Sequence, residues 1–379
     1  MSKIEIKKVE NKSDLKKFIK FPHKIYKNNP YWVPLLHFDE INTLDKKKNP
    51  AFEYCEAEYW LAYKDGEIVG RIAGILNKKS NEVWNTKNVR FGWVDFIEDI
   101  EVAKALFDTV ENWAKSKGME YVHGPMGFTD LDHEGMLVKG FDQLSSIASI
   151  YNYPYYPEFV EKLGYKKDAD WIQYKIKVPQ EIPDKVVKFS NWVINRYGLK
   201  VIKVKKAKQL LPYAKKMFIT MNKAFAPLYG YIPLTEKQID YYVKQYFSFI
   251  NPDFTTLIVK EDENGEAEVV AFAITMPSLS KGMQKANGHL FPFGFIHILK
   301  SLHTYDIIEM LLIGVHPDYQ KHGVPAIIHH ELHKTYLKYN VKYAVSSHQL
   351  ENNKVALNLW EMYLDKEQHI RRRAYIKKI

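Results

Sequence analysis

The order of apolar runs, turns and helical stretches in this chain of 379 residues occurs twice, with corresponding elements about 200 residues apart. In each half, two apolar runs flank a glycine turn, Asp65-Gly66 in the first half and Asn264-Gly265 in the second. Such a dipeptide between apolar runs is a strong hairpin signal. A further strand, an amphipathic helix and a short strand follow each hairpin. The pattern indicates an internal duplication of one module that contains both helices and strands.

This duplication predicts the division of the chain. We expect an N-terminal module over residues 1–178, a linker over 179–197 and a C-terminal module over 198–379. Pro179 and Pro183 suit a linker, because proline donates no backbone hydrogen bond to a strand or helix.

Composition excludes several classes of protein. The chain is 46% apolar and 14% aromatic, which is enough to form packed cores and rules out general disorder. The single cysteine, Cys55, excludes a disulfide framework and a four-cysteine zinc site. The net charge is +10, but it comes mainly from dispersed lysine, whereas nucleic-acid readers cluster arginine. We therefore expect no nucleic-acid partner; an anionic ligand or an acidic membrane surface stays open as a partner.

The sequence shows no targeting signal or membrane span. Residues 1–8 alternate apolar and charged side chains, as a strand does and a signal peptide does not. The longest apolar stretch, Leu290–Leu299, contains Pro292 and Gly294 and is too short to cross a bilayer. We expect a soluble, cytoplasmic protein.

The segment from Ile307 to Tyr339 is the most informative for chemistry. It predicts a strand, a polar turn and an amphipathic helix, and backbone N–H groups in such a turn form a cradle for an anion. Gly323 would let the backbone approach a ligand closely, and Pro325 suits the first turn of the helix. Lys321 and His322 would add positive charge. An ordinary strand–turn–helix connection is the alternative.

This segment resembles motif A of the GNAT superfamily of acyl-CoA-dependent N-acyltransferases. The motif's Val-x-Pro is Val315-His316-Pro317, and its glycine turn is Gln320-x-x-Gly323-x-Pro325. The resemblance implies that the turn binds the pyrophosphate of coenzyme A and that the preceding strand splays at a bulge. The cofactor-binding residues that it implies, including Asn353 of a second motif, are Ile313, Gly314, Val315, Gln320, Lys321, His322, Gly323, Val324, Pro325 and Asn353.

Two positions depart from the family pattern. Pro325 replaces a small residue, and Trp360 replaces the tyrosine that usually follows the Asn353-x-x-Ala356 motif. Tyr363, one helical turn further on, is therefore the candidate phenol proton donor. A non-catalytic GNAT-fold protein with a ligand-binding or regulatory role stays open as an alternative.

The whole chain resembles a bacterial subfamily of tandem GNAT-like proteins. The resemblance implies an α+β fold of two modules, each a mixed, mostly antiparallel twisted sheet flanked by helices. Some relatives are bacterial ceramide synthases, so a sphingoid-base N-acyltransferase is an alternative to a general amine acyltransferase. The segments that carry this resemblance are Phe21–Pro34, Asn49–Phe52, Gly124–Met126, Glu134–Asp142, Tyr153–Pro157 and Leu290–Gly294.

The two halves are not expected to be equivalent in function. The N-terminal half has Ile97–Glu101 in place of the glycine turn, and its three carboxylates would repel a pyrophosphate. Only the C-terminal module should therefore bind coenzyme A in this manner. The first half would support the fold and shape a pocket for the acceptor.

Amine acylation needs a base that takes the proton from the attacking amine. Glu309 is six residues before Val315, the spacing of the general base in the histone-acetylating branch of the superfamily, and burial on an apolar strand would make it more basic. Glu134, in the glycine-rich segment of the first half, is the rival candidate. A backbone N–H near Gly314 would stabilise the oxyanion.

The expected reaction moves an acyl group from acetyl-CoA or a longer acyl-CoA to a small-molecule amine, without a metal. His329 and His333 lie one helical turn apart, but with no third ligand evident we expect a polar outer face. Arg371–Arg373 are expected to be solvated charges on a terminal strand. The apolar segment 282–306 would cover the acceptor pocket, contact a lipid surface peripherally or pack against the other half. The sequence leaves the oligomeric state undetermined.

Overall fold

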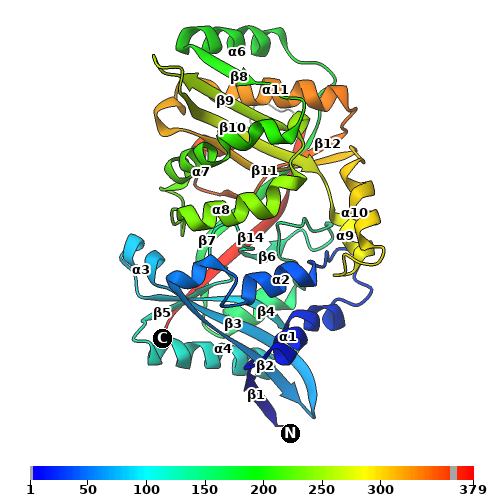
Figure 1. Cartoon of the computed structure of the whole chain (residues 1–379). Helices are drawn as coiled ribbons and strands as arrows, with labels where there is room; N and C mark the ends of the chain where they lie inside the picture. Colours follow the sequence, from blue (N-terminus) through cyan, green and yellow to red (C-terminus); the bar gives the residue numbers. More distant parts are fainter. Residues whose placement is uncertain (1–2, 359–364) are drawn as a thin grey trace. The chain divides into compact units, whose positions relative to one another are not determined.

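The computed structural model describes residues 3–358 and 365–379, which form two compact units. Unit 1 contains residues 1–172, 279–301 and 369–379, and unit 2 contains residues 173–278 and 302–368. Each unit is an α+β module with a central sheet and helices on both of its faces (Figure 1).

Unit 1 is built around the first predicted hairpin. Its elements are β1 (Ile4–Lys8), α1 (Lys12–Ile25), α2 (His37–Leu44), a 3₁₀ turn (Pro50–Glu53), β2 (Cys55–Lys64), β3 (Glu67–Asn77), α3 (Lys78–Trp84), β4 (Asn88–Phe96), α4 (Ile100–Ser116), β5 (Tyr121–Gly124), β6 (Met136–Lys139), α5 (Tyr155–Lys162), the start of β7 (Lys166–Lys177), α9 (Ser280–Ala286), α10 (Gly294–Leu302) and most of β14 (Lys366–Lys378). Its strands follow the order β1-β2-β3-β4-β5-β14, with β6 paired to β14. The hairpin between β2 and β3 is confirmed, and Asp65 and Gly66 both have positive φ, as a type I′ turn requires.

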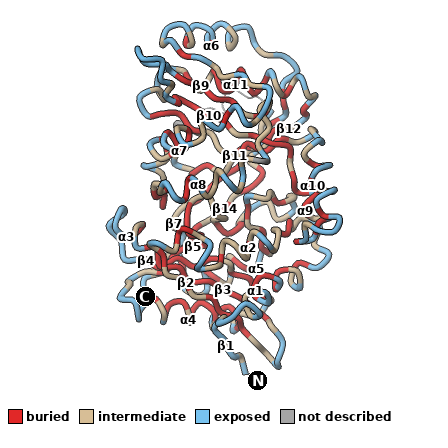
Figure 2. The backbone as a smooth tube through the Cα atoms, viewed as in Figure 1, coloured by how far each residue is buried: buried red, intermediate tan, exposed pale blue. Residues whose placement is uncertain are grey.

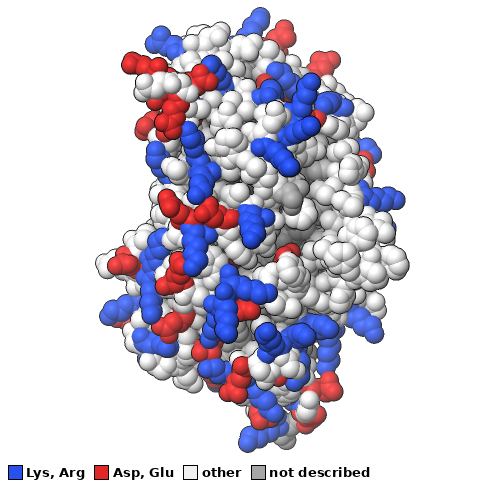
Figure 3. Space-filling model, viewed as in Figure 1, with Lys and Arg blue, Asp and Glu red and all other residues white. Residues whose placement is uncertain are grey.

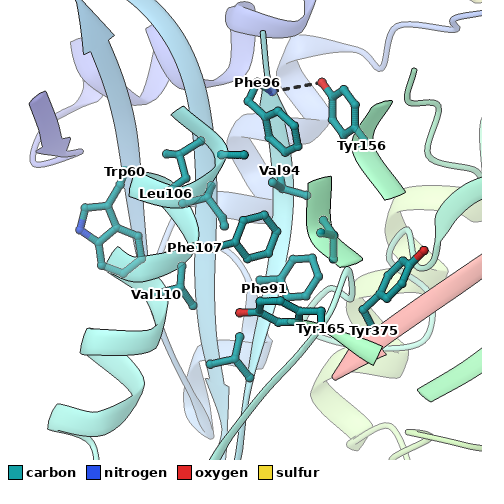
Figure 4. Close-up of a cluster of buried hydrophobic side chains, with 14 of the residues drawn as sticks. Trp60, Phe91, Val94, Phe96, Leu106, Phe107, Val110, Tyr156, Tyr165 and Tyr375 are labelled. Atoms are coloured by element: carbon teal, nitrogen blue, oxygen red, sulfur yellow. Dashed lines mark hydrogen bonds between the residues drawn. The ribbon is translucent and has the colours of Figure 1, made fainter. Parts of the chain in front are cut away.

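Alternation along the strands of unit 1 produces two cores. Trp60 and Ala62 of β2 face α4, whereas Tyr59 and Leu61 face α1 and α2. On the α4 side, aromatic rings from β4 and the segments around α5 interlock, and the Phe96 N–H donates to the Tyr156 hydroxyl at 3.1 Å (Figure 4). The central strands are accordingly buried along most of their length (Figure 2).

Unit 2 repeats this arrangement. Its elements are the end of β7, α6 (Asp184–Tyr197), β8 (Leu199–Ile202), a 3₁₀ turn (Ala207–Leu210), α7 (Leu211–Phe225), α8 (Glu236–Tyr246), 3₁₀ turns at Phe247–Phe249 and Pro252–Phe254, β9 (Thr255–Glu261), β10 (Ala267–Pro277), β11 (Ile307–Val315), a 3₁₀ turn (Pro317–Tyr319), α11 (Val324–Lys338), β12 (Tyr343–Val345), β13 (Gln349–Leu350) and α12 (Lys354–Asn358). The strands follow the order β7-β12-β11-β10-β9-β8. Helices α6 and α11 pack on one face, and α7 contacts β10 and β11.

The units differ from the expected domain boundaries in three respects. The expected linker, 179–197, contains α6, which packs through Val193 into the core of unit 2. Residues 173–177 of β7 pair with β12, and residues 375–378 of β14 pair with β5, so each unit takes its closing strand from the other half of the sequence. The segment 279–301 belongs to unit 1, where Gln284 donates to the carbonyls of Pro30 and Trp32.

Candidate functional site

The central feature of unit 2 is a fork between two parallel strands. Strand β11 pairs with β12 only at Ile307, Ile308 and Glu309, although β11 continues to Val315. One extra residue in β11 opposite Ile274 and Thr275 forms a bulge in its pairing with β10. The strand thus leaves β12 directly after Glu309, as the resemblance implied, and residues 310–315 have no β12 partner.

The turn after β11 presents backbone donors. No described residue accepts a hydrogen bond from the backbone N–H groups of Lys321, Gly323 or Val324. The last of these opens α11, a helix of 15 residues, so the helix dipole adds partial positive charge at the same point. Unpaired N–H groups around a left-handed glycine at a helix N-terminus are well suited to bind an anion such as a pyrophosphate.

The structure explains the glycine at position 323 by helix packing, whereas the sequence analysis expected it to let the backbone approach a ligand closely. Its φ of 75° is left-handed, and a Cβ there would lie 2.7 Å from Cζ of Phe189 and 3.1 Å from Cγ2 of Val193, both on α6. The missing side chain therefore allows α6 to pack on the turn, while the N–H group supplies the donor. Pro325 lies in the first turn of α11, as predicted.

The other predicted turn residues are brought together but have distinct roles. Gln320 donates from Nε2 to the Val315 carbonyl at 3.1 Å and so closes the turn onto the strand. Lys321 is exposed, whereas the His322 ring stacks on Tyr197 with a centroid distance of 4.8 Å. Gly314 packs against the Phe272 ring, which leaves no room for a side chain there.

A cavity of about 380 Å³ lies beside this turn within unit 2. Lys223 and Lys260, which no sequence pattern singled out, line it together with His316 and Tyr319. Its lining also includes the carboxylates of Glu268 and Asp318. Lys223 contacts His316 at 3.0 Å between Nζ and Nε2. No local pattern marks these lysines, because they come from α7 and β9 and meet the turn only in the folded unit.

Glu309 is at the point where the fork opens. It pairs with Met276 of β10 on one side and Val345 of β12 on the other, and it is only 6% exposed. The Ser278 hydroxyl donates to its Oε1 at 2.5 Å. A water-exposed glutamate at a strand end is thus excluded, and the carboxylate is held in place at the base of the fork.

The rival Glu134 belongs to unit 1, in the loop before β6. Burial, reinforced by the carboxylate of Asp130, raises the pKa of Glu134 well above its usual value, while Arg90 opposes this shift. Burial also raises the pKa of Asp130 to about 7 and that of Asp132 to about 6. Arg90 is the last residue of β4 that pairs with β5, just as Glu309 is the last residue of β11 that pairs with β12 in unit 2. The two residues therefore occupy equivalent positions.

Asn353 and Tyr363 are the remaining predicted site residues. Asn353 uses its Oδ1 to accept from the Ala356 N–H at 3.2 Å, so its side chain caps α12. Tyr363, the candidate proton donor, and Trp360 lie outside the described residues. Among residues 3–358 and 365–379, no cluster of three or more potential metal ligands occurs.

Two expectations about surface charge are wrong. His329 and His333 are buried, because α6 and the chain before it cover that face of α11, and Pro179 contributes a carbonyl 2.7 Å from His333 Nε2. Arg371 and Arg373 are only partly exposed, and they bind the buried Asp170 at 2.7 and 2.8 Å. Neither the histidines nor the arginines are free for a ligand.

Arg372 is buried as well, and its burial lowers its pKa to about 9.

No helix in the described part of the chain is both long and apolar enough to cross a bilayer.

Comparison with curated proteins finds two relatives, while no family model matches the chain. The chain is 29% identical over 324 residues to Protein YghO of Escherichia coli, covering 84% of this chain and 80% of that protein. It is 25% identical over 318 residues to the Bacterial ceramide synthase of Caulobacter vibrioides, covering 82% of this chain and 80% of that protein.

Solved structures match almost the full length. A tandem GNAT protein from the clavulanic acid biosynthesis pathway has a TM-score of 0.55 at 10% identity and covers 99% of this chain and 98% of its own. A GCN5-related N-acetyltransferase from Sphaerobacter thermophilus has a TM-score of 0.51 at 12% identity, with 99% and 95% covered. These matches confirm the expected fold class.

Proposed function

Because the chain has the tandem GNAT fold, we propose that it is an acyl-CoA-dependent N-acyltransferase with its acyl-CoA site in unit 2. The observation that carries this proposal is the fork between β11 and β12, which continues directly into the unpaired N–H groups at the start of α11. The fold supports N-acyl transfer in general, and the fork, the cradle and a buried carboxylate at one strand supply the groups that this chemistry needs.

Acyl-CoA would supply an activated thioester, and the cradle residues fit its pyrophosphate. The amine nitrogen forms a bond to the acyl carbon, the carbon–sulfur bond breaks, and the sulfur leaves as the thiolate of coenzyme A, which takes up a proton from solvent. In this proposal Glu309 takes the proton that the amine loses, and Ser278 holds the carboxylate in position through the hydrogen bond to Oε1. Backbone N–H groups of β11 beyond the fork are candidates for stabilising the oxyanion.

The cradle is tested by reversing one charge at its edge. Lys321 is exposed, so Lys321→Glu leaves the packing intact and places a carboxylate beside the proposed pyrophosphate site. Calorimetry should show that affinity for coenzyme A falls at least tenfold, about 1.4 kcal/mol. Lys208→Glu, on an exposed lysine elsewhere in unit 2, is the matched control and should bind normally. Equal affinity in both variants would remove the cradle from the proposal.

A sphingoid-base N-acyltransferase is the second candidate, because a relative over 82% of the chain is named a bacterial ceramide synthase. Release of free thiol should be compared for acetyl-CoA and a C16 acyl-CoA with sphinganine and with short primary amines. Turnover that requires both the long acyl chain and sphinganine favours the second candidate. Binding of coenzyme A without turnover on any pair favours a ligand-binding or regulatory protein.

A further inference from the structure

Unit 1 contains a second pocket, at the place that corresponds to the fork of unit 2. Strand β4 leaves β5 after Arg90, and one extra residue lies between Gly92 and Asp95 in its pairing with β3. Trp93, at this bulge, has a φ of 42°, a strained conformation for a tryptophan that is typical of functional sites. Trp93 and Asp95 line a solvent-open pocket of about 100 Å³.

The walls of this pocket are aromatic. Tyr26 and Trp32 stack with a centroid distance of 5.2 Å, and Trp93 and Tyr151 also line the space. Aromatic faces attract cations through their negative quadrupole, and the attraction grows where water is excluded. The aromatic lining therefore favours either an apolar or a cationic group.

The charges in the pocket decide between these two. Asp95 accepts from Arg71 at 2.7 Å and from the Tyr26 hydroxyl at 2.8 Å, so that carboxylate and the guanidinium compensate each other. Glu40 is only 9% exposed, and Trp93 donates from Nε1 to its Oε2 at 2.9 Å. No described residue gives a hydrogen bond to the other carboxylate oxygen. The charge of the Asp95 carboxylate is thus balanced by Arg71, whereas that of the Glu40 carboxylate has no cation of its own among the described residues of the pocket.

We propose that this pocket of unit 1 binds the primary ammonium group of a small organic amine, with Glu40 as its counter-ion and Trp32, Tyr26 and Trp93 as its walls. The volume limits the part that enters to a few heavy atoms, because a cavity of about 150 Å³ holds one benzene. Any longer portion of the amine must extend through the opening to solvent. The site is independent of the acyl-CoA site, so it can be tested without turnover.

The titration of Glu40 gives this proposal a second measurable consequence. Burial raises the pKa of Glu40 to about 7, although Arg71 and Trp93 oppose the shift. An ammonium ion needs the ionised carboxylate, so affinity should rise as the pH increases through about 7. The groups that face Glu40 from the surrounding elements are His23, Tyr26, His37, Asp39, Arg71, Asp95, Asp132, His133 and Tyr151.

Several of these neighbours complicate the pH test. Burial lowers the pKa of His23, His37 and His133, which favours neutral rings near pH 7, but protonation of these rings at lower pH would also repel an ammonium ion. Burial raises the pKa of Asp132 to about 6, so Asp132 ionises close to the same range. A Glu40 variant is therefore needed to assign the pH dependence.

The test uses the full chain and a pair of probes with the same shape, 2-aminoethanol and ethane-1,2-diol. Ligand-observed NMR at pH 8 should show at least tenfold tighter binding of 2-aminoethanol, and that preference should shrink at pH 5.5. Glu40→Gln, which can still accept from Trp93, should abolish both the preference and its pH dependence. Glu82→Gln, on an exposed residue of α3, should change neither. Equal binding of the two probes, no binding of either, or an unchanged Glu40→Gln variant would overturn the proposal.

A separate observation concerns the surface of α9 and α10. Phe291 and Phe293 are 72% and 67% exposed, and Phe295, Ile296 and Leu299 of α10 are exposed beside them. Residues 279–301 include exposed Lys281, Lys285 and Lys300 but no acidic residue. Figure 3 shows few charges at its right edge, where Figure 1 places α9 and α10. Exposed aromatic groups beside lysines complement an anionic lipid surface.

We infer that this face, defined by residues 291–299, docks on an anionic lipid membrane. Sedimentation with vesicles of phosphatidylglycerol and phosphatidylcholine (1:1) should retain the chain, and vesicles of phosphatidylcholine alone should retain at least fivefold less. Phe291→Ser combined with Phe293→Ser should reduce retention at least fivefold, whereas Phe249→Ser, on an exposed phenylalanine of unit 2, should not. The inference is refuted if the double variant is retained as strongly as the wild-type chain, or if the chain forms dimers through this face and does not bind vesicles.

Discussion

At the scale of single residues, the most consequential position is Glu309. It combines a location at the base of the fork with burial and a fixed hydrogen bond from Ser278. Glu134 is half-buried and lies among carboxylates in unit 1. The two residues can therefore be separated by mutation.

If Glu309 is the base, Glu309→Gln should lower kcat by about 10²–10⁴ while affinity for coenzyme A stays level. The amide keeps the shape of the side chain but cannot take the proton, so the loss should shrink at high pH, where more of the amine is already neutral. Steady-state kinetics across pH, with Glu134→Gln in parallel, measures this. A loss in the Glu134 variant alone would transfer the role to unit 1.

Ser278 is expected to act as a positioning residue. Ser278→Ala should reduce kcat by less than Glu309→Gln and should shift the pH profile of kcat, because the buried carboxylate loses the hydrogen bond that the Ser278 hydroxyl donates to Oε1. Ser278→Thr keeps a hydroxyl and should restore the profile. An unshifted profile in Ser278→Ala would show that the serine has no part in catalysis.

At the scale of elements, the contact between α6 and the turn before α11 is the clearest test of packing. Gly323→Ala would force alanine into a left-handed conformation and bring its Cβ to 2.7 Å from Phe189. The variant should lose about 1–3 kcal/mol of stability. In a double-mutant cycle with Phe189→Ala, the part caused by the clash should disappear and the part caused by backbone strain should stay. If the losses of stability in the two single variants simply add in the double variant, the whole cost of Gly323→Ala comes from backbone strain and none from the clash with Phe189.

The pairing of β7 with β14 within unit 1 gives a second prediction for elements. Burial alone would raise the pKa of Asp170, but hydrogen bonds from Arg373 and Arg371 lower it below the usual value. The ion pair therefore stabilises the fold above about pH 3.9, the unfolded value, and that contribution is lost as the pH falls through the lower folded pKa. Asp170→Asn should cost about 3 kcal/mol at pH 7, because two arginines lose a buried partner.

Thermal unfolding measures this loss, and the deficit of Asp170→Asn should diminish as the pH falls through the lowered pKa of Asp170, where the wild-type carboxylate also loses its charge. Asp108→Asn removes a carboxylate from the exposed pair with Lys104 and should cost less than about 1 kcal/mol. Comparable losses in both variants would contradict a special role for the Asp170 cluster.

At the scale of the whole molecule, we expect one coenzyme A per chain. In unit 1 the first turn of α4 is already capped, because the Asp99 side chain accepts from the Glu101 N–H and also binds Lys64. A pyrophosphate would have to displace that carboxylate and face Glu101. Calorimetry should give a stoichiometry of one, and two equivalent sites per chain would contradict the asymmetry.

The sequence by itself determined the features that depend on a few neighbouring residues. Asp65-Gly66 specifies the first hairpin turn because glycine and aspartate tolerate positive φ. The run from Ile307 to Pro325 specifies a strand, a turn and a helix start, and its resemblance to motif A implied that the strand splays at a bulge. The repetition of such local signals indicated a duplicated module of helices and strands, and the family resemblance implied the tandem α+β fold.

Only the tertiary structure decided which distant elements meet. The exchange of the closing strands β7 and β14, the burial of His329 beneath α6 and the contribution of Lys223 to the cavity beside the turn all join residues far apart in the chain. The pocket around Glu40 likewise combines α1, α2, β3 and β4. Local patterns carry no record of these partners, because strand pairing and helix packing are selected by the apolar surface that the whole unit buries.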